Sequence, residues 1–172
     1  YCILSSLKWH EVSSEKKIVN SPDNIELSTN HQKLINATIE TIAKRGLGET
    51  TISHVAKKAK VSQGYANFKF KSKENLLLSS LQFLSDEYKK SWSKILEDQN
   101  ISPEERVLKI IENDFSPKIA NRNKIAVWFA FYSEVKFRPS YLSICQYQDE
   151  IYSQQMEKLI QEINDKNNEK GL

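Results

Sequence analysis

The sequence has few of the residues that build metal centres, disulfide frameworks and tight turns. It contains two cysteines, three histidines, four glycines and four prolines among 172 residues. Cys2 and Cys145 lie far apart in the chain, so this inventory yields neither a zinc ligand set nor a disulfide framework. No run of about 18 apolar residues is present, which argues against a membrane span. We therefore expect a cytoplasmic protein that carries no metal or other cofactor and has no membrane partner.

Groupings typical of catalysis are also missing. No histidine has a serine or cysteine at the spacing of a nucleophilic pair, and no glycine-rich phosphate loop follows a strand. Neighbouring carboxylates such as Asp149 and Glu150 diverge on a helix, which does not suit general acid/base chemistry. The sequence therefore predicts a protein that is not an enzyme.

Positive charge is concentrated in one short segment. Residues 31–75 contain nine Lys/Arg and three Glu, a net charge of +6, whereas residues 1–30 carry −1 and residues 76–172 carry −2. A basic surface confined to one part of a molecule is typical of proteins that bind polyanions. A solvated lysine-rich surface would have the same composition, so charge alone leaves both interpretations open.

From Thr29 onward, apolar residues recur at intervals of three and four, which predicts helices. A first helix ends at Gly46, a threonine at position 50 or 51 caps a second, and Ser62 caps a third. Two short helices that are joined by a tight turn and lined with alanines are typical of a helix-turn-helix.

In a helix-turn-helix, the N-terminal half of the second helix enters the major groove of DNA. Gln63 and Asn67 lie four residues apart and can make bidentate contacts with adenine, and Tyr65 can contact a base, a thymine methyl or a phosphate. The lysines suited to phosphate contacts are Lys57, Lys58, Lys60, Lys69, Lys71 and Lys73. The alternative is a helical hairpin whose polar face only meets water.

The rest of the chain predicts a helical body. Ser72 is the expected cap of a long helix that runs to about Glu97, and Ser102 followed by Pro103 predicts another helix start. Further helices are expected at residues 104–113, 123–137 and 140–164. No strand-like alternation competes with this pattern, so the predicted fold class is all-α.

These residues resemble the DNA-binding domain of the TetR family of transcriptional regulators. The resemblance covers roughly residues 30–78 and rests on Thr50-Thr51-Ile52, Val55-Ala56, Ala59-Lys60-Val61-Ser62-Gln63-Gly64 and Phe68-Lys69-Phe70-Lys71-Ser72-Lys73-Glu74-Asn75-Leu76. The later segment Trp128-Phe129-Ala130-Phe131 is similar to the choline-responsive betaine-pathway repressors of that family. Residues 1–27 show no periodicity, which predicts a poorly ordered leader. The resemblance implies a helix-turn-helix domain over residues 28–78 and an effector-binding and dimerisation domain over residues 79–172.

The resemblance also assigns roles by position. It implies base contacts by Ser53, Gln63, Tyr65 and Asn67, and phosphate contacts by Thr51, Gly64, Lys69 and Lys73. Members of the family commonly carry Tyr or His at the position of Lys69, so this chain retains a phosphate contact there but lacks ring stacking on the sugar. The implied protein is a homodimeric repressor that binds a double-stranded DNA operator and is released by a small effector such as choline.

A box of aromatic rings beside a carboxylate would suit such an effector, because ring faces attract a desolvated cation by roughly 0.5–2 kcal/mol each. The candidate pocket residues are Trp92, Asp114, Trp128, Phe131, Tyr132, Glu134 and Tyr147. Aromatic residues at helical spacing usually belong to an ordinary core, so the choline pocket is implied by the resemblance rather than by spacing.

Regulators of this family generally close with two further helices that pack across a two-fold axis. Here the apolar pattern ends near Ile163 and residues 164–172 are polar, so we expect the final dimerisation helix to be missing. Either the chain is truncated or divergent, or residues 140–164 carry a reduced interface. The alternative function is a helical protein-interaction module whose basic head binds DNA weakly or not at all.

Overall fold

The computed structural model describes residues 29–169, and all the regular secondary structure in that range is helical. The helices are α1 (Thr29–Arg45), α2 (Ile52–Ala59), α3 (Gln63–Phe70), α4 (Lys73–Leu96), α5 (Pro103–Asp114), α6 (Arg122–Glu134) and α7 (Pro139–Glu169). The predicted all-α class is confirmed, whereas the leader expected over residues 1–27 lies outside the described residues. None of the helices in the described part of the chain combines the length and hydrophobicity that a bilayer crossing requires.

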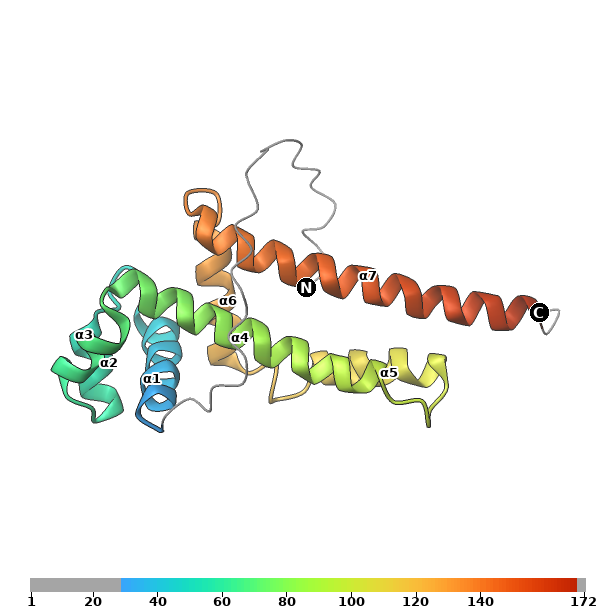
Figure 1. The fold of residues 1–172 in the computed structure, drawn as a ribbon, viewed down its shortest axis with the longest axis horizontal. Helices are drawn as coiled ribbons and strands as arrows, with labels where there is room; N and C mark the ends of the chain where they lie inside the picture. The colour runs from blue at the N-terminus through green and yellow to red at the C-terminus, as the bar shows by residue number, and fades with distance from the viewer. Residues whose placement is uncertain (1–28, 170–172) are drawn as a thin grey trace.

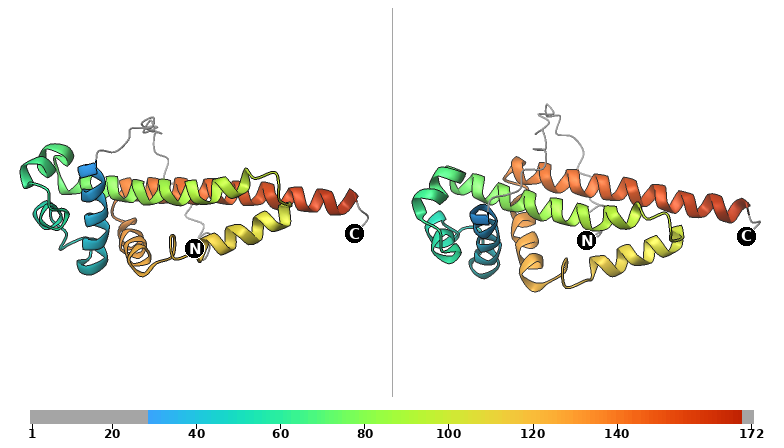
Figure 2. Two further views of the ribbon diagram at one scale, coloured as in Figure 1. Left: turned by 90° about the horizontal axis from the view of Figure 1, so that it is seen from below. Right: turned by 60° about the horizontal axis from the view of Figure 1, so that its bottom comes forward.

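The molecule is elongated, with a head made of α1, α2 and α3 at one end (Figure 1). The body consists of α4 to α7, and α4 and α7 run side by side along its length (Figures 1 and 2). Helix α5 packs against both α4 and α7, while α6 packs against α1 and α7. Head and body are therefore joined twice, through the continuous helix α4 and through the contact of α6 with α1.

The capping residues predicted from the sequence begin the helices in the structure. Thr51, Ser62, Ser72 and Ser102 each accept a hydrogen bond from the backbone N–H three residues later, at 3.1–3.2 Å. Each side-chain oxygen thereby satisfies an N–H group that has no partner within the first turn. Gly46 follows α1 with a φ of 77°, the left-handed conformation that ends a helix and that glycine adopts without strain.

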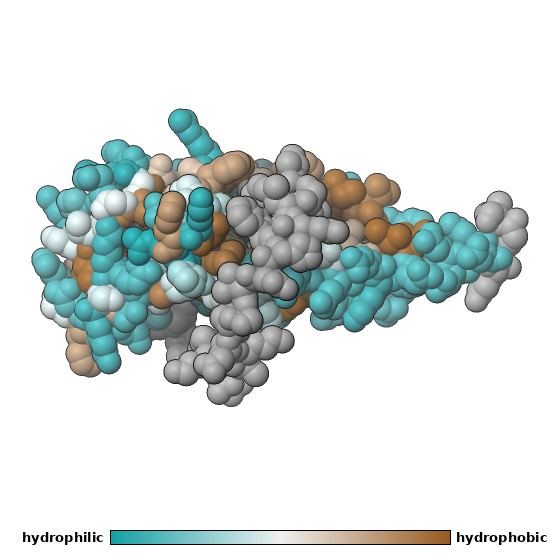
Figure 3. All heavy atoms as spheres, turned by 90° about the horizontal axis from the view of Figure 1, so that it is seen from above, coloured by the Kyte–Doolittle hydropathy of each residue, from teal (hydrophilic) through white to brown (hydrophobic). Residues whose placement is uncertain are grey.

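Two helix boundaries differ from those expected. Helix α6 ends at Glu134 rather than near residue 137, because the next residues bond to carbonyls only three residues back, as Phe137 does to Glu134 at 2.9 Å, which closes the helix in a turn before Pro139 begins α7. Helix α7 continues to Glu169, although its apolar pattern ends near Ile163, and the surface at that end of the molecule is hydrophilic (Figure 3). Side-chain bonds four residues apart support its last turns, namely Gln161 with Asp165 at 2.7 Å and Lys166 with Glu162 at 3.2 Å.

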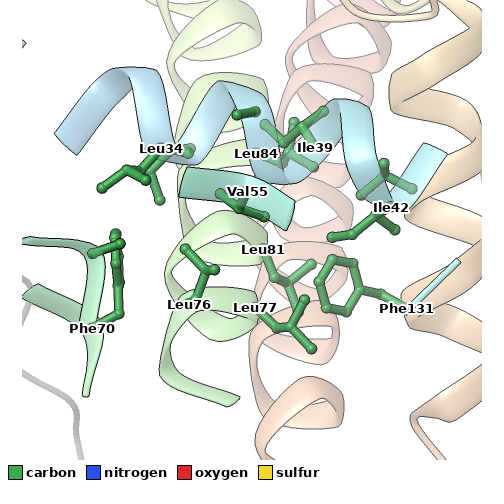
Figure 4. Close-up of a cluster of buried hydrophobic side chains, with 14 of the residues drawn as sticks. Leu34, Ile39, Ile42, Val55, Phe70, Leu76, Leu77, Leu81, Leu84 and Phe131 are labelled. Atoms are coloured by element: carbon green, nitrogen blue, oxygen red, sulfur yellow. The ribbon is translucent and has the colours of Figure 1, made fainter. Parts of the chain in front are cut away.

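Most buried apolar side chains form one cluster that spans the head and the adjoining half of the body (Figure 4). Leu34 of α1, Val55 of α2, Leu76 and Leu81 of α4, and Phe131 of α6 are each fully buried in it. The predicted boundary between residues 78 and 79 falls inside α4 and inside this shared core. A second cluster lies farther along the body and contains Trp92, Ile110 and Leu159.

The turn between α2 and α3 contains a lysine in a left-handed backbone conformation. Lys60 has φ 54° and ψ 43°, and its backbone N–H donates to the carbonyl of Lys57 at 3.3 Å. The next residue, Val61, donates to the carbonyl of Ala56 at 3.0 Å and closes the turn. A left-handed residue other than glycine costs roughly 1–2 kcal/mol, so the packing of the two helices imposes this conformation on Lys60.

We expect Lys60→Gly to raise the free energy of unfolding by about 1 kcal/mol, because glycine adopts positive φ without the steric penalty. The matched substitution Lys57→Gly, inside the right-handed helix α2, is expected to lower it by about 1 kcal/mol. Urea denaturation of both variants measures these changes. A loss of stability in both would show that Lys60 is not strained.

Candidate nucleic-acid interface

Helices α2 and α3 pack closely because small side chains lie where they meet. Ala56 and Ala66 are buried, with exposed fractions of 2% and 0%, and Val55 of α2 is fully buried beside them. Residues 60–62 form the short turn between the two helices. The pair is the helix-turn-helix that the sequence predicts, and it leaves the other face of α3 open to solvent.

The exposed side of α3 carries the two amides predicted to read bases. Ala66 and Phe70 form its buried face, and Gln63 and Asn67 are exposed on one flank, one turn apart. Tyr65 lies on the opposite flank and is half-buried. The structure therefore brings Gln63 and Asn67 together on a surface that can meet base edges.

Two more predicted contact residues lie at the start of α2. Ser53 is exposed in its first turn. Thr51, also exposed, accepts a hydrogen bond from the His54 backbone N–H at 3.1 Å. Because a hydroxyl has one donor in addition to its acceptor sites, Thr51 can still donate to a phosphate while it caps the helix.

The two lysines predicted to contact phosphate have different surroundings. Lys69 is exposed in the last turn of α3. Lys73 is half-buried, and its ammonium group donates to the carbonyl of Gly48 at 2.6 Å, which ties the loop after α1 to the start of α4. An ammonium group has three donors, so a phosphate contact stays possible, but Lys73 also holds the head together. Its substitution would not isolate a DNA contact.

Positive charge surrounds α3 without nearby carboxylates in the sequence. The segment from Thr50 to Lys73 contains six lysines and neither Asp nor Glu. Among the described residues, only one of these six lysines forms an ion pair, Lys58 with Glu40 at 2.8 Å. Cations that are not neutralised within the protein favour phosphate groups, which supply most of the affinity for a nucleic acid.

The sequence assigns no DNA contact to Phe68, yet it is the most exposed large apolar side chain of the head, at 80%. It lies two positions after the buried Ala66 and two before the buried Phe70, which places it opposite the buried face at about 100° per residue. Gly64, one turn earlier on this outward face, has no atom within 4 Å of the position that a Cβ would occupy. The spacing of the apolar residues in α3 is the signal that could have identified Phe68.

The seven residues predicted to line an effector pocket do not lie together. The second hydrophobic cluster of the body and its edge contain Trp92 and Asp114. Phe131 belongs to the cluster shown in Figure 4. Trp128 and Tyr132 are partly buried and pack against that cluster. The molecular surface carries Glu134, in an ion pair with Arg138, and Tyr147, which is 57% exposed.

Asp114 is the member of that set with the most distinctive surroundings. Its two carboxylate oxygens accept hydrogen bonds from Tyr88 of α4 at 3.1 Å and from Tyr152 of α7 at 3.0 Å. The Tyr152 ring lies 5.6 Å from the Trp92 ring and 5.8 Å from the Tyr88 ring, centroid to centroid. Burial raises the pKa of Asp114 above its ordinary value, although both tyrosine hydrogen bonds oppose the shift. No Lys or Arg among the described residues forms an ion pair with it.

An all-α chain with a basic helix-turn-helix at one end and a helical body behind it has the architecture of DNA-binding regulators. Residues 34–79 match the family described as bacterial regulatory proteins, tetR family. The chain therefore carries a TetR-type helix-turn-helix domain, as the sequence motifs predicted.

Among its relatives is the HTH-type transcriptional regulator BetI 1 of Chromohalobacter salexigens, which is 32% identical over 108 residues, 63% of this chain and 54% of that protein. The chain thus spans about half the length of the curated relatives that it matches. The predicted resemblance to BetI regulators is confirmed, and these relatives are named as regulators rather than enzymes.

Solved structures share the fold at low sequence identity. A TetR transcription regulator from Haloarcula marismortui superposes with a TM-score of 0.70 at 17% identity, over 80% of this chain and 72% of that one. A protein from Saccharomonospora viridis, crystallised in complex with choline, superposes with a TM-score of 0.68 at 18% identity, over 78% of this chain and 70% of that one. At these identities the likeness concerns the fold alone.

We expect Gln63→Ala and Asn67→Ala to reduce the preference for a selected duplex over a random duplex by about 5-fold to 150-fold, because each loses a bidentate base contact. Lys69→Ala should instead weaken binding to both duplexes alike and reduce the salt dependence by about one ion. Fluorescence anisotropy with labelled duplexes measures these effects. If all three variants lost affinity equally for every DNA sequence, the assignment of base contacts to Gln63 and Asn67 would be contradicted.

Proposed function

We propose that this chain is a DNA-binding repressor of transcription that a small cationic effector, choline or a related quaternary ammonium compound, releases from its operator. The observation that carries the proposal is the outward surface of α3. It presents exposed amides at Gln63 and Asn67 within a lysine-rich, acid-free segment of the head. Amides suit base edges and lysines suit phosphates, so this combination favours duplex DNA as the ligand.

We further propose that the regulator acts as a homodimer whose interface includes α7. Leu142 and Ile160 are 36% and 49% exposed and lie eighteen residues apart, which is five helical turns and therefore the same face. Exposed apolar side chains on one face of a long helix support contact with a second helix. Two copies would place their α3 helices on half-sites about 34–36 Å apart and combine the two binding energies.

The proposed effector site centres on Asp114. This carboxylate is partly desolvated and bonds to Tyr88 and Tyr152, and the Tyr152 ring lies beside the rings of Tyr88 and Trp92. A quaternary ammonium ion there would gain both a counter-charge and ring faces. We propose that a cation bound at Asp114 takes the place of at least one of the two tyrosine hydroxyls that bond to this carboxylate. That displacement would shift α7 relative to α4.

A polar contact near the head supports transmission of such a shift. Glu74, in the first turn of α4, accepts hydrogen bonds from Arg138 at 3.0 Å and from the buried hydroxyl of Tyr141 at 3.1 Å. Arg138 and Tyr141 lie at the start of α7. A tilt of α7 against α4 would therefore pull on the helix that follows α3, and in a dimer it would change the separation of the two recognition helices.

A salt titration tests the proposed DNA binding directly. We expect the logarithm of the affinity for duplex DNA to fall linearly with the logarithm of salt concentration, with a slope of about −0.9 for each phosphate neutralised. Lys60→Ala and Lys69→Ala should each reduce this slope by about one ion, whereas Lys158→Ala in α7 should leave it unchanged. No measurable affinity even at low salt would favour the alternative of a protein-interaction module.

The effector proposal predicts that Asp114→Asn weakens choline binding at least about tenfold, because the cation loses a charged partner in a partly desolvated site. Affinity should also fall as pH is lowered through the raised pKa of Asp114, since protonation removes the negative charge. Isothermal titration calorimetry with choline measures both effects.

Asp86→Asn, in the same helix as Tyr88, is the matched control for this prediction. Asp86 also accepts a hydrogen bond from a side chain, that of Gln82, at 2.8 Å, but it is exposed to solvent. Its substitution should change choline affinity by less than about twofold, because an exposed carboxylate gains little from pairing with an ion. Equal losses in the two variants, or no choline binding to the unmodified chain at millimolar concentration, would contradict the proposed site.

A further inference from the structure

The exposed side chain of Phe68 adds almost nothing to the stability of the folded head. Its side chain is 80% exposed, whereas Phe70 in the same helix is only 4% exposed and packs in the core. Burying a phenylalanine side chain stabilises a protein by roughly 1.5–3 kcal/mol. Because Phe68 is exposed, the head without a ligand lacks nearly all of this stabilisation. Single exposed apolar residues are common on protein surfaces, so its position on the recognition helix is what distinguishes it.

The geometry of α3 puts Phe68 at the centre of the surface that enters the groove. Ala66 and Phe70 are each two residues away, so both project about 200° from Phe68 around the helix axis. Gln63 and Asn67 lie to one side, between the buried face and the outward direction. When α3 approaches DNA with its outward face, the side chain of Phe68 therefore points directly toward the groove.

No side chain of the preceding helical turn at Gly64 covers the ring of Phe68. Side chains of a helix lean toward its N-terminus, which for Phe68 is the direction of Gly64. Gly64 has no side chain, and no atom lies within 4 Å of the position where one would begin. A ligand can thus approach the backbone at Gly64, in the N-terminal half of α3, and also the ring of Phe68 one turn farther along the helix.

The surrounding charge indicates which ligand the ring meets. Six lysines and no carboxylates occupy the segment from Thr50 to Lys73, so the complementary partner is a polyanion. In the major groove of duplex DNA, the thymine C5-methyl is the apolar group that base edges present, and phenylalanine is among the residues that pack against it. An exposed apolar ring within this lysine-rich segment matches that arrangement.

We propose that Phe68 is a specificity-determining residue that reads the C5-methyl group of thymine in the operator. The inference rests on the proposed DNA binding and adds a readout that the amides of Gln63 and Asn67 do not supply. Adenine and guanine edges are read by hydrogen bonds, whereas this contact distinguishes thymine from cytosine through an apolar methyl group. The operator half-site must then contain a thymine at a fixed distance from the bases that Gln63 and Asn67 contact.

Replacement of thymine by deoxyuridine tests this contact, because it removes the methyl group and leaves base pairing unchanged. Duplexes that bind the full chain are first selected from a randomised pool, and each thymine of the selected site is then replaced in turn. We expect one position per half-site at which the replacement lowers affinity by about threefold to tenfold. Phe68→Ala should lower affinity for the thymine duplex by a similar factor and should abolish the difference between thymine and deoxyuridine at that position.

Phe129→Ala is the matched control, because Phe129 is 70% exposed on α6, outside the head. It should change neither the affinity nor the response to deoxyuridine. Phe68→Leu, which keeps an apolar side chain, should retain part of the discrimination. Circular dichroism checks that each variant remains folded.

The outcomes separate this inference from the proposed function. If no duplex is enriched from the pool, DNA binding itself is wrong. If a site is enriched but every deoxyuridine replacement leaves affinity unchanged, or if Phe68→Ala responds to deoxyuridine as the unmodified chain does, DNA binding stands and the thymine contact is overturned. Loss of affinity in Phe68→Ala on all sequences alike would assign the ring to the sugar-phosphate backbone and would also overturn it.

Discussion

The packing of α4 against α7 is the contact on which the rest of the structure depends. Both helices contribute side chains to both hydrophobic clusters, so they connect the head to the far end of the body. Between the clusters, the buried side chains of Ser85 and Gln148 form a hydrogen bond at 3.1 Å across the two helices. A buried polar pair of this kind fixes the register of two helices, because sliding one past the other would leave both groups without partners. The position of the head therefore follows from the relative position of α4 and α7.

This arrangement places two carboxylates, one in the body and one near the head, along the same pair of helices. Asp114 is held between Tyr88 of α4 and Tyr152 of α7, where burial disfavours its charge, while Glu74 is held near the head by Arg138 and Tyr141. A cation at the first site and a tilt at the second would be coupled through rigid helices rather than through a flexible linker. Ordinary side-chain chemistry thus accounts for how an event in the body could alter the head.

The head also contains features that do not favour stability. Lys60 adopts a left-handed conformation that glycine would adopt without strain, Phe68 is exposed, and the lysines around α3 repel one another. Residues and backbone conformations that disfavour folding are expected where a surface binds a ligand. Their concentration around one eight-residue helix agrees with the proposed contact between α3 and DNA.

The sequence alone determined where helices begin, because capping is local: Thr51, Ser62, Ser72 and Ser102 act on an N–H group only three residues away. It also determined the all-α class, the helix-turn-helix and the exposed amides of α3, since a period of three to four residues specifies which face is buried. Tertiary structure decided which distant residues meet. It separated Trp92 and Asp114 from Trp128, Phe131 and Tyr132, and it brought Tyr88 and Tyr152 to Asp114 from two other helices. Helical periodicity shows the direction in which a side chain points, but the partner that it meets depends on how whole helices pack.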